Sequence, residues 1–152
     1  MIRTAVGAII YQGKEILLVH KVKISSIKNS NNHISGDWDF LKGGVEEDDK
    51  DLQDALLREL EEETGSTNYK IIKQLDEKIS FSFPEDVAQK IGYIKQETTM
   101  YIVEYLGDGS DLMPKDDEIN AVEFLNSDEV FERLTHQDTK EFYVRVQSKM
   151  KE

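Results

Sequence analysis

The sequence lacks cysteine entirely among its 152 residues. This absence excludes disulfide bonds, thiolate catalysis and cysteine-ligated zinc, but it leaves the cellular compartment open. Long hydrophobic runs are also missing. The longest apolar run near the N-terminus, residues 5–11, is far too short to span a bilayer, and no signal-peptide cleavage pattern follows it. We therefore expect a cytoplasmic protein that does not enter a membrane.

Positive charge is scarce, because 19 lysines and arginines face 31 aspartates and glutamates, which gives a net charge of −12. A chain with this charge repels nucleic acid and polyphosphate at long range. Any phosphate ligand must then be held through metal ions and a local cluster of basic residues. This balance argues against a protein that coats nucleic acid, and we expect no binding to DNA.

The length fits one domain over residues 1–152, large enough to bury about 68–70% of the surface of the unfolded chain. The residue pattern predicts strands over 3–11, 15–21, 38–41, 97–106 and 119–125 and one or two strands over 69–83, with Gly13 in a hairpin turn between the first two. Residues 23–36 are polar and predict a long loop. Strands interleaved with a central helix and closed by helices indicate a layered α/β or α+β domain.

Three helices are expected. The central helix begins with Asp48 or Asp49 as its N-cap and ends at Gly65. A short helix follows Ser127 as its cap. A C-terminal helix is indicated by the apolar spacing of Phe142, Val146 and Met150.

The central helix belongs to the most informative segment, residues 43–66, which read GGVEEDDKDLQDALLRELEEETGS. As a helix it places Glu59, Glu62 and Glu63 on one stripe, where like charges repel one another. A divalent cation such as magnesium or manganese relieves that repulsion by binding the carboxylate oxygens. The opposite, apolar stripe can dock the helix on a core; it consists of Leu52, Ala55, Leu56 and Leu60.

This segment resembles the Nudix box, the signature of hydrolases that act on nucleoside diphosphates linked to another group. The residues in register are Gly44, Arg58, Glu59, Leu60, Glu62, Glu63 and Gly65. Two positions depart from the box: Lys50 replaces its first glutamate, and Ser66 replaces an aliphatic residue. The alternative is an amphipathic helix with a solvated acidic face and a glycine cap. The placement of Arg58 and the diglycine before the helix argue against that alternative.

The resemblance implies a Nudix fold, which is a mixed sheet sandwiched between helices, and a pyrophosphohydrolase that depends on Mg²⁺ or Mn²⁺. By this resemblance the metal ligands are Glu59, Glu62, Glu63 and the Gly43 carbonyl. Glu59 or Glu63 is the candidate general base, and Arg58 orients a neighbouring glutamate or the ligand. A carboxylate outside the box often completes the site. Glu118 is the candidate for it, with Glu97 as the alternative.

Outside the box, the chain is most similar to the branch that hydrolyses dinucleoside polyphosphates or removes pyrophosphate from triphosphorylated RNA 5′ ends. The stretches that carry this similarity are 38–44 (WDFLKGG), 81–84 (FSFP) and 92–96 (GYIKQ). By this similarity Lys42 and Lys140 contact phosphates. Phe81 and Phe83 either stack on a base or pack in the core, and core packing is expected for at least one of them.

Two other functions remain open. A pyrophosphatase acting on nucleoside triphosphates or nucleotide sugars differs from the first hypothesis only in its pocket. A Nudix-like domain that binds a nucleotide or RNA end without cleaving it is also open, since Lys50 stands where the box has an acid.

Overall fold

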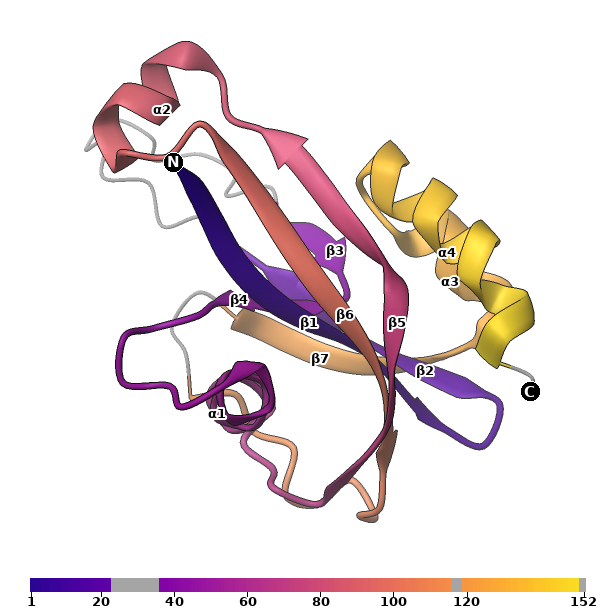
Figure 1. The fold of residues 1–152 in the computed structure, drawn as a ribbon. Coiled ribbons are helices and arrows are strands. Elements are labelled where there is room, and N and C mark those ends of the chain that lie inside the picture. Colours follow the sequence, from indigo (N-terminus) through magenta and orange to yellow (C-terminus); the bar gives the residue numbers. More distant parts are fainter. Residues whose placement is uncertain (23–35, 116–118, 151–152) are drawn as a thin grey trace, which may run out of the picture.

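The computed structural model describes residues 1–22, 36–115 and 119–150. Its centre is a seven-stranded mixed sheet with strand order β3-β2-β1-β6-β5, in which β4 also pairs with β1 and β7 with β2 (Figure 1). The strands are β1 (Ile2–Gln12), β2 (Glu15–Lys21), β3 (Asp37–Asp39), β4 (Leu41–Gly44), β5 (Tyr69–Ser82), β6 (Lys95–Tyr105) and β7 (Ile119–Asn126). The pair β1·β6 is parallel, whereas the other pairs are antiparallel.

The predicted hairpin is confirmed, with Gly13 at a positive φ of 61° between β1 and β2. The expected short strand over 38–41 is wrong in one respect, because it is two strands that separate at Phe40. Asp39 in β3 pairs with Val19 of β2, and Leu41 in β4 pairs with Ala8 of β1. The change of partner brings the following diglycine to the edge of β1.

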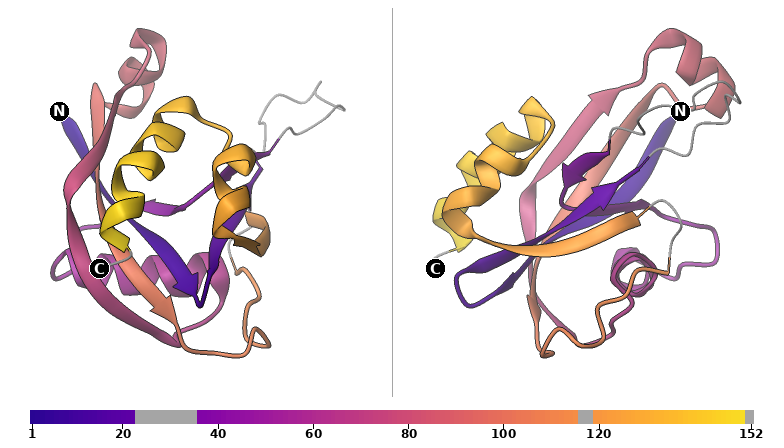
Figure 2. Two further views of the ribbon diagram at one scale, coloured as in Figure 1. Left: turned by 90° about the vertical axis from the view of Figure 1, so that its right-hand side faces the viewer. Right: turned by 180° about the vertical axis from the view of Figure 1, so that it is seen from behind.

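Helices cover both faces of the sheet, so the chain forms an α+β sandwich (Figures 1 and 2). On one face lies α1, while α3 and α4 lie side by side on the other. A further short helix, α2, connects β5 to β6 at one end of the sheet and was not predicted. The helices are α1 (Leu52–Thr64), α2 (Glu85–Ile91), α3 (Ser127–Arg133) and α4 (Gln137–Met150). Within the described residues, no helix combines the length and apolar character needed to cross a membrane.

The two faces of the sheet have separate cores. Alternation along β1 directs Ile9 toward α4, where it joins Phe142 and Val146, and directs Ile10 toward α1, where it joins Leu56. Both helices therefore bury an apolar stripe of the kind predicted from the spacing of their residues. The site described below lies where β4 and α1 meet the end of the sheet that carries α2.

The ends of the helices correct two predictions. Asp51, rather than Asp48 or Asp49, is the N-cap of α1, and its Oδ1 accepts the N–H of Asp54 at 2.8 Å. The cap of α3 is Asn126, whose side chain accepts the N–H of Asp128, rather than Ser127. The predicted end of α1 is confirmed at Gly65, which has a φ of 84°.

Ser66, which departs from the box, is buried and held by a hydrogen bond of its side chain. Its hydroxyl donates to Asp111 Oδ2 at 2.5 Å, and the same carboxylate accepts from Asn68 and from the hydroxyl of Tyr105. The carboxylate ties the end of α1 and the start of β5 to the loop that follows β6. A hydroxyl at position 66 thus replaces an apolar contact by a hydrogen bond.

Candidate active site

The close approach of β4 to α1 depends on Gly43. A Cβ atom at this residue would lie 2.0 Å from the carboxyl carbon of Glu59, much closer than any van der Waals contact. Residue 43 therefore has to lack a side chain for the carboxylate of Glu59 to rest against the strand. The glycine in the turn and the acid in the helix form one packed unit.

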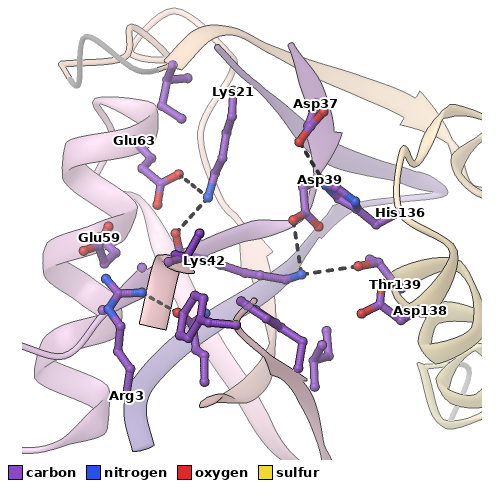
Figure 3. A pocket seen from close by; sticks show the side chains of 18 of the residues that line it. Arg3, Lys21, Asp37, Asp39, Lys42, Glu59, Glu63, His136, Asp138 and Thr139 are labelled. Atoms are coloured by element: carbon purple, nitrogen blue, oxygen red, sulfur yellow. Dashed lines mark hydrogen bonds and ion pairs between the residues drawn. The ribbon is translucent and has the colours of Figure 1, made fainter. Parts of the chain in front are cut away.

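This unit forms one wall of a cleft of about 810 Å³ that lies between α1 and the start of α4 (Figure 3). Six of the residues predicted to act at a site line it: Lys42, Gly43, Glu59, Glu63, Phe81 and Phe83. Arg58, Glu62 and Lys140 do not belong to its lining, and Glu118 lies outside the described residues.

Two of the buried carboxylates that line this cleft belong to α1. Glu59 is 8% exposed and Glu63 is 2% exposed. Burial raises the pKa of Glu59 above its ordinary value, and this outweighs the opposing effects of a hydrogen bond with Glu63 and of the guanidinium of Arg58. Two acids this close and this buried favour an added positive charge between them, whether it is a proton or a cation.

Arg58 uses its whole guanidinium in the turn beside these acids. Its Nε and Nη2 donate to the two carboxylate oxygens of Asp49 at 3.0 and 2.9 Å, and Nη2 also donates to the Gly44 carbonyl at 2.9 Å. Nη1 donates to Glu59 at 2.9 Å and to Glu62 at 3.2 Å. These contacts fill the five N–H groups that an arginine side chain offers. The pair with Asp49 is the largest cause of a pKa for Arg58 above the ordinary arginine value.

Glu62 is not gathered with the other two acids. Its side chain is 48% exposed and its carboxylate lies against Arg58. Among residues 1–22, 36–115 and 119–150, no group of three or more histidine, aspartate and glutamate side chains lies close enough to hold a metal ion. The predicted metal set is therefore assembled only in part, by Glu59, Glu63 and Gly43, and its role stays a prediction.

Three basic side chains, Arg3, Lys21 and Lys42, line the cleft among its carboxylates. Lys42 lies 3.1 Å from Asp39 and donates to the hydroxyl of Thr139 at 3.4 Å. Lys21 donates to the backbone carbonyl of Lys42 at 3.0 Å, and Arg3 donates to the side chain of Gln96. Lys42 was predicted from the sequence, whereas Arg3 and Lys21 were not. Each of the two lies near the end of a strand, where only the pairing register shows what it faces.

That register explains how distant residues meet. Arg3 in β1 pairs with Gln96 in β6, and Gln96 pairs with Phe81 in β5. Paired residues share a face of the sheet, so these three side chains lie in a row across adjacent strands. Glu97, the alternative candidate for a metal ligand, points to the opposite face and is not part of the lining.

The expectation that Phe81 or Phe83 packs in the core is wrong. Phe81 is 38% exposed and Phe83 is half-buried, and the two rings meet edge to face with their centroids 5.0 Å apart. Phe81 is near the end of the β5·β6 ladder, beyond Leu75 and Ile79, the residues of β5 that share a core with α4. The pair therefore stands at the rim of the cleft and not beneath a helix.

Lys140 is directed elsewhere. Its ammonium group lies 5.1 Å from the centre of the Phe131 ring, while the preceding residue, Thr139, lines the cleft. Successive residues of a helix point about 100° apart, so one of two neighbours can face the cleft without the other. Contact of Lys140 with phosphate stays a prediction.

Comparison with known families identifies the family of the chain. The family model described as the NUDIX domain matches residues 1–146. The chain belongs to the NUDIX family. This match and the relatives below confirm the family and the pyrophosphohydrolase class predicted from the box at residues 44–66.

Among curated Nudix relatives, an RNA pyrophosphohydrolase of Campylobacter jejuni subsp. jejuni serotype O:2 is 30% identical over 111 residues, which cover 72% of this chain and 70% of the relative. One of Sulfurovum sp. is 28% identical over 142 residues, covering 88% and 83%. The same fold occurs in the MutT protein of Methanosarcina mazei, with a TM-score of 0.70 at 20% identity over 99% and 96% of the two chains. It also occurs in an Ap4A hydrolase of C. elegans, with a TM-score of 0.69 at 17% identity over 97% of each chain.

Proposed function

We propose that this Nudix pyrophosphohydrolase cleaves a phosphoanhydride bond in the triphosphate at an RNA 5′ end or in a dinucleoside polyphosphate. The observation that carries the proposal is the convergence of Arg3, Lys21 and Lys42 on the cleft that holds Glu59 and Glu63. The cleft also holds five acids, Asp37, Asp39, Glu59, Glu63 and Asp138. A phosphate group therefore binds there together with a divalent cation that offsets the surplus negative charge, while the three basic side chains contact its oxygens. The names of the curated relatives support RNA as the first candidate.

The residues divide the work of phosphoryl transfer between them. Arg3 and Lys42 neutralise charge on the phosphoryl oxygens, and Lys21 offsets the charge of Glu63 at the buried end of the cleft. Glu59 or Glu63 accepts the proton of the attacking water, and its raised pKa makes Glu59 a stronger base than an ordinary carboxylate.

The donor set fits a divalent cation. Carboxylate oxygens of Glu59 and Glu63 and the carbonyl oxygen of Gly43 are the hard ligands that Mg²⁺ and Mn²⁺ prefer. When bound there, such an ion supplies Lewis-acid activation of the phosphate and lowers the pKa of a bound water. Glycine at position 43 leaves room for these oxygens, because a side chain there would displace the carboxylate of Glu59.

The aromatic pair at the rim binds the nucleoside part of the substrate. Phe81 is exposed in the protein, although it carries a large apolar ring, and it shares the cleft with Arg3. Stacking of a base on such a ring tolerates any base, which suits an enzyme that acts on RNA ends of different sequence. The first base then lies over Phe81 or Phe83 while the phosphates reach the cations.

The test is a turnover assay with Mg²⁺ or Mn²⁺ on triphosphorylated RNA, diadenosine polyphosphates, nucleoside triphosphates and ADP-ribose, followed by phosphate and pyrophosphate release. We expect the highest kcat/KM with triphosphorylated RNA or a diadenosine polyphosphate. A preference for nucleoside triphosphates or ADP-ribose would instead support the alternative of a pyrophosphatase that acts on nucleoside triphosphates or nucleotide sugars. Binding of a substrate without turnover of any would favour the non-catalytic alternative.

Two isosteric variants test the residues. Glu63→Gln should lower kcat at least about a hundredfold, because its carboxylate is buried in the cleft. Glu62→Gln should lower it less, because its carboxylate is exposed and lies against Arg58. Wild-type rates in Glu63→Gln would remove the assignment of the site.

A further inference from the structure

The box of this chain has a cation where the family has its first acid, yet the turn before α1 still supplies an acid to Arg58. Lys50 itself is exposed, and its backbone N–H donates to Asp54 at 3.1 Å. The carboxylate that meets Arg58 belongs to the preceding residue, Asp49, whose side chain is only 4% exposed. The acid is present, but one residue earlier in the sequence.

The contact between Asp49 and Arg58 has the geometry of a strong ion pair. Nε and Nη2 of Arg58 donate in parallel to Oδ1 and Oδ2 of Asp49 at 3.0 and 2.9 Å. Two parallel charge-assisted bonds fix the plane of the guanidinium as well as its position. Two hydrogen bonds with Glu46 close the turn that carries Asp49. The N–H of Asp49 donates to the Glu46 carbonyl at 3.0 Å, and the N–H of Glu46 donates to the Asp49 carboxylate at 2.8 Å.

The remaining N–H groups of Arg58 then reach the site. With Nε and one N–H of Nη2 held by Asp49, the other N–H of Nη2 meets the Gly44 carbonyl, and Nη1 meets Glu59 and Glu62. Without Asp49, the guanidinium loses the bonds that set its plane and can turn fully onto the two glutamates. It would then compete with a cation for the oxygens of Glu59.

We infer that Asp49 is the positioning residue that replaces the missing acid at position 50, holding Arg58 so that it bonds Glu59 through Nη1 alone. This inference rests on the proposed function for its kinetic consequences. It also explains why Lys50 does not imply a non-catalytic domain, because the interaction that an acid at that position can make is made by its neighbour. Asp49 acts through Arg58 and does not touch the substrate.

The experiment compares Asp49→Asn, which keeps the shape and removes the charge, with Lys50→Gln as the matched control in the same turn. We expect Asp49→Asn to lower kcat about 10- to 100-fold with little change in KM, and to weaken Mn²⁺ binding measured by titration calorimetry. Lys50→Gln should match the wild type in both measurements. Equal kcat and Mn²⁺ affinity in the two variants would overturn the inference.

A double-mutant cycle separates positioning from general structure. If Asp49 acts through Arg58, Asp49→Asn should cause no further loss of kcat in an Arg58→Ala background, whereas independent roles give losses that multiply. For the case in which Asp49→Asn does not fold, the wild type itself provides a readout by NMR. The Nε–H of Arg58 should exchange slowly with solvent, and rapid exchange would contradict the pairing.

Failure of the proposed function remains distinguishable from failure of this inference. If the wild type turns over none of the substrates, the proposed function fails, while the Mn²⁺ titrations of the wild type and Asp49→Asn still decide the role of Asp49. Equal Mn²⁺ affinities together with normal turnover in Asp49→Asn would instead leave the function intact and remove Asp49 from it.

Discussion

The ammonium group of Lys21 lies 3.6 Å from the buried carboxylate of Glu63, and it also donates to the Lys42 carbonyl at 3.0 Å. Lys21 is the last residue of β2, whereas Glu63 is in the last turn of α1. One side chain therefore links β2, β4 and the buried acid of α1 (Figure 3). It also places a positive charge where a divalent cation is expected to bind.

Removing that charge should have opposite effects on the two ligands. In Lys21→Met, we expect Mn²⁺ to bind about fivefold more tightly at low salt, since a cation no longer offsets Glu63. The KM for a triphosphorylated substrate should rise, because one of three cations in the cleft is gone. Lys115→Met, which breaks the exposed pair of Lys115 with Glu61 away from the cleft, is the control for net charge. Unchanged Mn²⁺ affinity in Lys21→Met would show that this pair does not act on the cation.

Alanine at each residue of the diglycine should affect a different ligand. A methyl group at residue 43 would meet the carboxylate of Glu59 at 2.0 Å, whereas one at residue 44 would meet the guanidinium of Arg3 at 2.3 Å. Gly43→Ala should therefore weaken Mn²⁺ binding and lower kcat about 10- to 100-fold. Gly44→Ala should raise KM with little effect on Mn²⁺ binding. The same profile from both variants would contradict separate roles for the two glycines, one beside Glu59 and the other beside Arg3.

The aromatic pair should contribute to nucleoside binding and little to folding. Replacing Phe81 or Phe83 by alanine should raise KM for triphosphorylated RNA by about 5- to 100-fold, the loss of one stacked base. Inorganic tripolyphosphate offers no base, so its inhibition constant should stay unchanged and serves as the control. A large fall in Tm with unchanged KM would instead mean that the rings serve packing.

Folding stability should fall at low pH because Asp111 becomes protonated. A hydrogen bond from Ser66, followed by those from Tyr105 and Asn68, holds the pKa of Asp111 below its ordinary value. Because the folded pKa is lowered, the contribution to stability is present above the unfolded value of about 3.9 and is lost as the pH falls toward the folded value. In Asp111→Asn, the urea midpoint should be lower near pH 6 and fall less between pH 6 and pH 3 than in the wild type.

Ser66→Ala provides the companion measurement. It removes the donor with the largest effect on Asp111, so the pH dependence of its urea midpoint should lie between those of the wild type and Asp111→Asn. A profile identical to that of the wild type would show that Ser66 does not set the acid sensitivity of the fold.

Periodicity predicted the elements whose contacts are local. The apolar stripe of α1 follows from residues spaced three and four apart, its end follows from a glycine with positive φ, and the hairpin follows from Gly13 between two apolar runs. The short helix α2 was not predicted, because none of its residues is buried and its sequence therefore has no apolar stripe. The N-cap of α1 was misplaced because Asp48, Asp49 and Asp51 are equally good caps by type, and only the tertiary pairing of Asp49 with Arg58 assigns them.

The sequence alone determined the family, the central acidic helix and the diglycine next to it, because a spacing fixed along one helix and turn survives without knowledge of the rest of the chain. Tertiary structure decided which groups share the cleft. Arg3, Gln96 and Phe81 come together through strand register across a parallel and an antiparallel pair, and Lys21 meets Glu63 through the packing of β4 on α1. Such contacts join residues far apart in the chain, and they depend on pairing and helix rotation that no local pattern encodes.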